Sequence, residues 1–246
     1  FSNDSGTTWS GWLSTSVTGA DGTTLSQTIT ASNVQFNIDS INQNKIRFRI
    51  EDIAGNVVTS PDYIIKIDST LPTGWTSFWP TGWSTTQTPN VSIQVQDITS
   101  GLNTTSAEYQ YSKDGGGNWS GWIAASVTGP SGTINLQTIT ATGVPFNQDS
   151  ATQNQIMFRI RDVAGQVNTS IAYSVSIDTT IPGGWTSNTP SGWNNLSTVT
   201  ATIQVQDNGS GLDVSTAQYQ FSKDGGTTWS NWVSAIIIGS NGNTSL

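Results

Sequence analysis

A repeat with a period of 110 residues constrains this chain more than any other feature of its sequence. The octet at 2–9 recurs at 112–119 and again at 222–229, so the offsets are 112 − 2 = 110 and 222 − 112 = 110. The segment 46–50 returns at 156–160 with the same offset. A period of this length matches one small domain and exceeds the 40–50 residues of a propeller blade. The sequence therefore predicts a tandem array of domains.

Each copy shows the two-residue alternation that is typical of β-strands. Apolar and polar residues alternate over 91–96, 107–111, 156–160 and 173–177, and over 201–206 one period after the first of these. Such alternation puts one face of a strand in a core and leaves the other face polar. Turn residues end each run, and no stretch sustains a 3.6-residue period. About seven short strands in roughly 110 residues predict an all-β, immunoglobulin-like sandwich.

The boundaries between copies are placed at two similar linkers. Residues 67–72 read Ile-Asp-Ser-Thr-Leu-Pro, and residues 177–182 read Ile-Asp-Thr-Thr-Ile-Pro. Proline lacks a backbone donor, so it suits a crossing between domains. With the boundaries at these linkers, residues 1–69 are the C-terminal part of one domain, residues 70–179 are a complete domain, and residues 180–246 are the N-terminal part of a third. We expect the chain to be cut inside domains at both ends, with strand addition between copies as a route to a homopolymer.

Composition excludes several functional classes. The chain has no His and no Cys, which leaves no Ser-His-Asp or Cys-His nucleophile system, no disulfide and no ordinary zinc site. Eight Lys and Arg residues and a net charge of −8 do not provide a basic surface for nucleic acid. No apolar run approaches the ~20 residues of a membrane span. We therefore expect neither an enzyme nor a membrane-spanning or nucleic-acid-binding segment.

Two short motifs resemble known families. The pattern Ser-x-Asp-x-Gly-x-x-Trp, present three times, resembles the Asp-box of sialidases and other secreted β proteins. The linkers, together with the segment 161–165, resemble bacterial and archaeal Ig-like repeats. That resemblance implies a structural role in an adhesin stalk, a surface layer or an extracellular filament, outside the cell. The motif also has a local interpretation, in which Asp accepts backbone N–H groups, Gly adopts a positive φ and Trp packs beneath the hairpin. Its residues are Asp4, Gly6, Trp9, Asp114, Gly116, Trp119, Asp224, Gly226 and Trp229.

Aspartates near the linkers suggest a metal site. In an Ig-like sandwich the incoming linker and two loops share one pole, which would gather Asp68, Asp97 and Asp162. The next junction offers Asp178 and Asp207, with a third partner expected after residue 246. Three close carboxylates repel one another unless a cation lies between them, and calcium accepts carboxylates, carbonyls and water. The sequence thus predicts calcium between domains. The alternative is that each Asp caps its own turn.

Tryptophans and sequons raise two further possibilities. Trp119 and Trp122 are three apart, which in an extended strand would send them to opposite faces, one toward the core. The tryptophans expected to pack between domains or to stack on glycans are Trp75, Trp83, Trp122, Trp185, Trp193 and Trp232. Asn-x-Ser/Thr sequons suggest glycosylation, most plainly at Asn90, Asn103, Asn168, Asn195 and Asn208. Two alternatives to a structural role stay open: a carbohydrate-binding array that uses exposed Trp, and an accessory region of a large secreted hydrolase.

Overall fold

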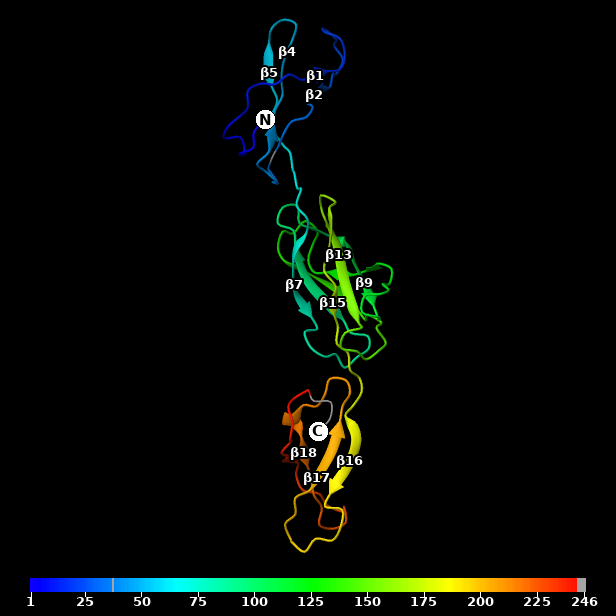
Figure 1. Cartoon of the computed structure of the whole chain (residues 1–246). Coiled ribbons are helices and arrows are strands. Elements are labelled where there is room, and N and C mark those ends of the chain that lie inside the picture. Colours follow the sequence, from blue (N-terminus) through cyan, green and yellow to red (C-terminus); the bar gives the residue numbers. More distant parts are fainter. Residues whose placement is uncertain (37, 243–246) are drawn as a thin grey trace.

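The computed structural model describes residues 1–36 and 38–242, and it is all-β. Apart from strands, the regular structure in these ranges is one 3₁₀ turn, η1, at Val214–Thr216. The predicted all-β class is confirmed. None of the described residues belongs to a helix long and apolar enough to cross a membrane. Three lobes follow one another along a line, with the N-terminal segment in one end lobe and the segment that holds β16 to β18 in the other (Figure 1).

The middle lobe, residues 70–179, is built from two antiparallel sheets and is called here the middle sandwich. One sheet has five strands in the order β10-β9-β13-β14, with β15 also paired to β13, and the other has four in the order β11-β12-β8-β7. Its strands are β7 (Thr73–Trp79), β8 (Val91–Gln96), β9 (Leu102–Ser112), β10 (Ile123–Ala124), β11 (Ser126–Val127), β12 (Gln137–Ala141), β13 (Gln155–Asp162), β14 (Val167–Thr169) and β15 (Tyr173–Ser174).

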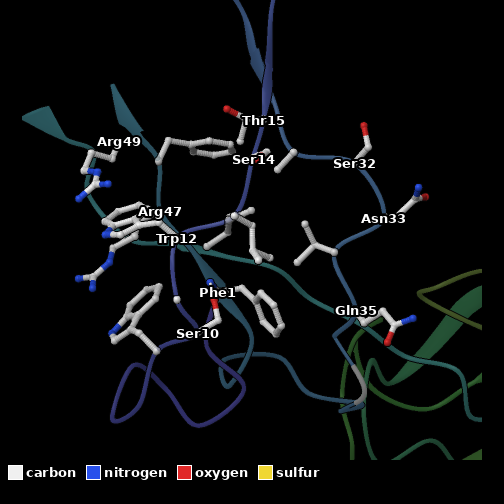
Figure 2. Close-up of a pocket in the computed structure, with 17 residues that line it drawn as sticks. Phe1, Ser10, Trp12, Ser14, Thr15, Ser32, Asn33, Gln35, Arg47 and Arg49 are labelled. Carbon is white, nitrogen blue, oxygen red and sulfur yellow. Dashed lines mark hydrogen bonds between the residues drawn. The ribbon is translucent and has the colours of Figure 1, made fainter. Parts of the chain in front are cut away.

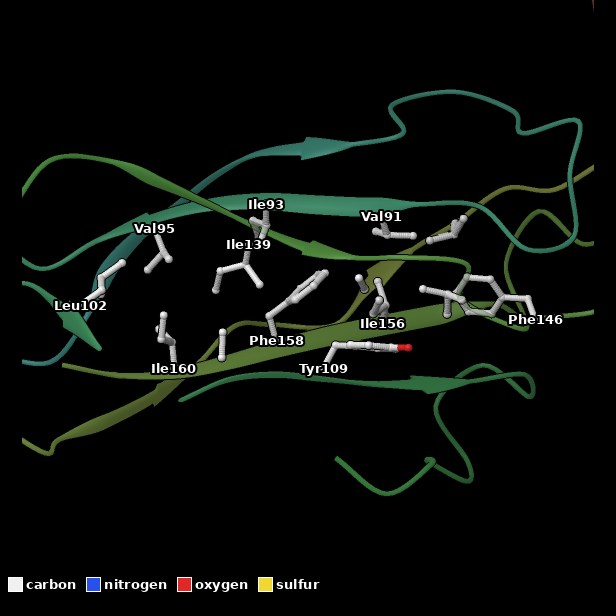
Figure 3. Close-up of a cluster of buried hydrophobic side chains, with 14 of the residues drawn as sticks. Val91, Ile93, Val95, Leu102, Tyr109, Ile139, Phe146, Ile156, Phe158 and Ile160 are labelled. Atoms are coloured by element: carbon white, nitrogen blue, oxygen red, sulfur yellow. The ribbon is translucent and has the colours of Figure 1, made fainter. Parts of the chain in front are cut away.

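The buried core of the middle sandwich lies between its two sheets. The alternating residues of β8, β12 and β13 face inward, as their period predicts, and Ile93, Ile139 and Phe158 are fully buried (Figure 3). Trp75 and Phe78 of β7 are partly buried and pack against this cluster. The cluster comprises Val91, Ile93, Val95, Leu102, Ala107, Tyr109, Ile139, Ala141, Val144, Phe146, Ile156, Phe158, Ile160, Val175 and Ile177.

The flanking lobes contain short two-stranded pairs. The first segment, residues 1–69, holds β1 (Ser16–Val17), β2 (Ile29–Thr30), β3 (Lys45–Ile46), β4 (Arg49–Glu51), β5 (Val57–Thr59) and β6 (Tyr63–Ile64). The third segment, described over 180–242, holds β16 (Gly183–Thr189), β17 (Thr202–Gln206), β18 (Gln218–Tyr219) and β19 (Val233–Ser234).

These pairs keep the register of the middle sandwich at the 110-residue offset. Val17 lies opposite Ile29 as Val127 lies opposite Ile139. The pairs β3–β6, β4–β5, β16–β17 and β18–β19 likewise reproduce β13–β15, β13–β14, β7–β8 and β9–β10. The first segment thus reproduces pairings of β11 to β15, and the third segment reproduces pairings of β7 to β10.

Burial does not follow the repeat. Ile93 is fully buried, whereas its counterpart Ile203 is 53% exposed. Alternation at 201–206 predicts a core-facing strand, and this expectation is wrong for the chain as described. The reason is that β8 is paired with β12 in its own sheet and faces the second sheet across the core, whereas β17 is paired in the described residues with β16 alone.

Candidate metal centre

Three aspartates converge where the linker enters the middle sandwich. Asp68 belongs to the linker, Asp97 follows the last residue of β8, and Asp162 ends β13. One carboxylate oxygen from each lies within 4.8 Å of the others. The predicted grouping of Asp68, Asp97 and Asp162 is thus present, although they are up to 94 positions apart (162 − 68 = 94).

Asp97 is held by the loop that follows it. Its Oδ1 accepts backbone N–H bonds from Thr99, Ser100 and Gly101 at 3.1, 2.9 and 2.8 Å. The tight loop needs the positive φ of 76° at Gly101, which favours glycine. These bonds fix one oxygen of the buried carboxylate and orient the other, Oδ2, which accepts no hydrogen bond.

Asp162 has a similar arrangement. Its Oδ1 accepts the backbone N–H of Gln166 at 2.8 Å, and its Oδ2 is buried without a hydrogen-bond partner. Burial raises the pKa of Asp162, and repulsion from Asp68 and Asp97 adds to this, against the backbone hydrogen bonds that lower it. The site therefore disfavours negative charge at Asp162.

Asp68 brings the linker into the cluster. Its Oδ1 accepts from the Thr70 N–H and hydroxyl at 3.0 and 2.7 Å, and its Oδ2 accepts the Ser100 N–H at 3.0 Å. Burial raises the pKa of Asp68, but the hydrogen bonds from Ser100 and Thr70 outweigh it and the pKa is lowered. Asp68 is thus an ionised ligand candidate that already contacts the loop after β8.

No side-chain cation neutralises the cluster within the described part of the chain. The ion pairs there are Lys45–Asp62 and Arg159–Glu108, and neither involves the three aspartates. Two buried carboxylate oxygens without partners are costly, since a buried charge normally needs a partner. Calcium binds oxygen at about 2.3–2.6 Å, so two ligands on one ion lie at most about 5 Å apart. The 4.8 Å spacing fits that limit.

The next junction repeats part of this arrangement. Asp178 accepts the N–H groups of Thr180 and Ser210 at 3.0 and 2.5 Å. Asp207 accepts those of Gly209 and Gly211 at 3.0 and 2.8 Å. Both predicted residues, Asp178 and Asp207, are buried and contact one loop. Among the described residues, a three-carboxylate group forms at Asp68, Asp97 and Asp162 and not at this junction.

Side chains that the sequence reasoning missed hold the linkers in place. Gln166 Nε2 donates to the Asp68 and Thr70 carbonyls at 3.1 and 2.9 Å. Its counterpart 110 residues earlier is Asn56, so the repeat gave no signal for it. Asp149 accepts from Thr179 N–H at 3.0 Å. The residue 110 positions before Asp149 is also an aspartate, and this repetition in the sequence could have indicated Asp149 as a functional residue.

In the Asp-box turns the repeated pattern of residues serves the turn itself, as the local interpretation of the motif predicts. Asp114 Oδ1 accepts from the Ser112 hydroxyl at 2.7 Å and from the Asn118 N–H at 2.8 Å. Gly116 has φ 94°, and the Trp119 indole donates to its carbonyl at 3.0 Å. The first copy, with Asp4, Gly6 and Trp9, repeats these bonds, and in the third Asp224 and Gly226 keep the turn while Trp229 is 60% exposed.

The tryptophans fall into different environments. Trp119 and Trp122 lie in the turn between β9 and β10, outside any strand, so the opposite-face expectation does not apply and neither belongs to the buried core. Arg159 lies 4.2 Å above the Trp122 ring and pairs with Glu108 at 2.6 Å. Trp75 packs on the core of its own sandwich. The remaining predicted tryptophans, Trp83, Trp185, Trp193 and Trp232, are exposed.

The predicted glycosylation sites differ in accessibility. Asn90, Asn195 and Asn208 are exposed. Asn103 is half-buried, and its side-chain oxygen accepts from the Thr105 hydroxyl at 2.8 Å. Asn168 donates its side-chain N–H to the Pro72 carbonyl at 2.7 Å, so a glycan there would replace a bond to the linker.

The geometry defines an all-β protein with a cluster of three carboxylates, two of them buried, contributed by a linker and by the C-terminal ends of β8 and β13. Comparison with known proteins gives no match to a family model, a curated protein or a solved structure.

Proposed function

We propose that the chain is a mechanical element: a segment of an extracellular filament, surface layer or adhesin stalk made of tandem Ig-like domains of about 110 residues. Support comes from the strand register that recurs at this offset and from the hydrophobic core of residues 70–179. In such an array each sandwich bears load through its own core and passes it on through the junctions.

The observation that carries this proposal is the position of Asp68. It comes from the linker, yet its carboxylate lies with those of Asp97, which follows β8, and Asp162, which ends β13, in the sandwich that follows. A calcium ion on these three carboxylates would tie the linker to the sandwich at a fixed place. The junction would then resist bending more strongly with the ion than without it.

Calcium titration with two readouts tests the proposal. Small-angle scattering should show a longer, stiffer particle with calcium than with a chelator. The melting midpoint of the middle sandwich should rise, since an ion that binds the native state alone stabilises it by about 2.7 kcal/mol at 100 times its Kd. Equal midpoints and equal scattering curves in the two conditions would refute the calcium-stiffened junction.

A carbohydrate-binding array is the second candidate, favoured by exposed indoles. Trp83 is 41% exposed and lines a cavity of about 260 Å³ together with Asp149 and Asn208. Trp232 is 62% exposed. Trp122 is already stacked by Arg159. A glycan array with wild type, Trp83→Ala and Trp122→Ala tests this function: selective binding lost with Trp83→Ala supports it, and no binding by wild type refutes it.

A further inference from the structure

The turns at Asp162 and Asp52 are two copies of one β-hairpin connection. They join β13 to β14 and β4 to β5. In both turns the aspartate N–H donates to the carbonyl of the residue four positions later at 3.0 Å. The N–H of that later residue donates to the aspartate Oδ1 at 2.8 Å. The later residue is Gln166 in the middle sandwich and Asn56 in the first segment. The two turns therefore differ by one methylene in the side chain at this position.

The two amide side chains donate to different acceptors. Asn56 Nδ2 donates back to Asp52 Oδ2 at 2.9 Å, so both carboxylate oxygens of Asp52 have partners. Gln166 Nε2 donates away from its own turn, to two carbonyls of the linker at 3.1 and 2.9 Å. Asp162 Oδ2 is consequently buried without a hydrogen-bond partner. The direction of this one amide thus decides whether the turn offers an unpartnered carboxylate oxygen.

Gln166 also connects two of the three clustered carboxylates. Its backbone N–H donates to the Asp162 carboxylate, and its side chain donates to the main-chain carbonyl of Asp68. The Asp68 carboxylate accepts the Ser100 N–H at 3.0 Å. A single residue therefore holds the linker beside the cluster and leaves Asp162 Oδ2 unpartnered.

We propose that Gln166 is a positioning residue that opens this turn to calcium, and that asparagine at the same position closes the turn to the ion. The physical reason is side-chain length. Asparagine is shorter by one methylene, about 1.5 Å, so its amide falls outside hydrogen-bond distance of the linker carbonyls. The same amide reaches the carboxylate of its own turn, as it does in the first segment. Calcium would have to displace that donor from Oδ2.

Two variants of the full chain separate the two effects of Gln166. Gln166→Ala removes the bonds to the linker and leaves Asp162 Oδ2 without a partner. Gln166→Asn removes the same bonds and also supplies the competing amide. We expect calcium affinity, measured by isothermal titration calorimetry, to fall in the order wild type, Gln166→Ala, Gln166→Asn. The Kd of Gln166→Asn should exceed that of Gln166→Ala by about tenfold, because a hydrogen bond to a charged group must be broken.

Melting midpoints in chelator should separate the same two variants in the other direction. The amide of Gln166→Asn satisfies a buried oxygen that Gln166→Ala leaves unsatisfied, so Gln166→Asn should melt at the higher temperature. A residue that only held the linker would not produce this pattern, since both variants lose the same linker bonds. Equal Kd values and equal midpoints for the two variants would overturn the proposal, as would tighter calcium binding by Gln166→Asn than by Gln166→Ala.

Asn56→Ala is the matched control in the equivalent turn. It removes the amide from Asp52, which belongs to no three-carboxylate group among the described residues, so the calcium Kd should stay at the wild-type value. The first segment has a cavity of about 320 Å³ beside Trp12, Arg47 and Arg49 (Figure 2), and neither Asp52 nor Asn56 lines it. The control therefore leaves that cavity intact.

Asn168→Ala is the control for the linker bonds. Asn168 Nδ2 donates to the Pro72 carbonyl at 2.7 Å, so this variant loosens the linker without changing the turn at residues 162–166. Its Kd should rise less than that of Gln166→Asn. An equal rise would show that any loosened linker bond weakens calcium binding, which would overturn the specific role of Gln166.

This inference rests on the calcium-bound junction of the proposed function, but the two can be told apart. Wild type that binds no calcium would refute the junction and with it the role of Gln166. Calcium binding by wild type, together with equal affinities of Gln166→Ala and Gln166→Asn, would refute the role of Gln166 and leave the junction in place.

Discussion

Asp97 and Asp162 share one buried site in which the Oδ2 atom of each carboxylate has no hydrogen-bond partner. Their Oδ1 atoms accept backbone N–H bonds, so neither side chain can turn away without breaking these bonds. Without a cation, the like charges and the missing hydrogen bonds both destabilise the folded state. The Oδ2 atoms of Asp97 and Asp162 are therefore available as ligands for a cation. The junction is therefore expected to respond to calcium more than to general ionic strength.

Asp162→Asn, which removes one charge from the cluster, should have different effects on the melting midpoint with and without calcium. Asp162→Asn relieves repulsion from Asp68 and Asp97, so in chelator we expect a melting midpoint equal to or above that of wild type. With calcium it should lie below, since a ligand is lost. Thermal unfolding in both conditions measures this.

Asp52→Asn is the matched control for Asp162→Asn. Asp52 accepts the Asn56 N–H at 2.8 Å, as Asp162 accepts that of Gln166, but it belongs to no three-carboxylate group in the described residues. Its substitution should leave the calcium response intact. An equal loss of response in both variants would argue against binding at the predicted centre.

Equivalent isoleucines should differ in their contribution to stability. Ile93→Ala removes a fully buried side chain and should cost about 2–5 kcal/mol. Ile203→Ala changes a side chain that is 53% exposed and should cost much less in dilute, monomeric protein. Denaturant unfolding at low concentration measures both. Similar losses would mean that the third segment has a closed core of its own.

The Asp-box turn should lose its contribution to stability in acid. Hydrogen bonds from Asn118 and Ser112 lower the pKa of Asp114 from 3.8 to about 2. A lowered folded-state pKa stabilises the fold above the unfolded pKa, and this stabilisation is lost as the pH falls toward the folded pKa. The midpoint difference between wild type and Asp114→Asn should therefore shrink between pH 4 and 2.

Exposed Asp21, outside the motif, is the control for Asp114. Asp21→Asn should have a small effect on the midpoint across the same pH range. A midpoint difference for Asp114→Asn that stays constant down to pH 2 would contradict the proposed role of the charged carboxylate.

Gly101 should not tolerate a side chain. It has φ 76°, and a Cβ there would collide with the backbone of Gly132. Gly101→Ala should destabilise the middle sandwich by more than about 1 kcal/mol and disturb the N–H that it donates to Asp97. Gly121→Ala, where nothing lies within 4 Å of the new Cβ, should be nearly neutral. Chemical denaturation of both variants compares them.

Much of the candidate site could be predicted because its signals are repeated in the sequence. Asp68 and Asp97 have counterparts in Asp178 and Asp207. At each junction both aspartates accept backbone N–H bonds from the loop that follows β8 or β17. Gln166 could not be predicted, since its copy is Asn56 and its role depends on where the linker passes. The environment of Trp122 also escaped prediction, because it depends on Arg159 from a distant strand.

The sequence by itself predicted the all-β class and which residues alternate along the strands, because alternation depends on neighbours in the chain; the strand bounds differ, as β9 begins at Leu102 and not near 107. Only the tertiary structure decided which apolar faces are covered. Ile93 and Ile203 have the same strand context, but Ile93 is buried because β12 pairs with β8 and the second sheet packs against them, whereas β17 pairs in the described residues with β16 alone. Burial depends on contacts between residues far apart in the chain, and a local pattern contains no information on whether the covering strand is in place.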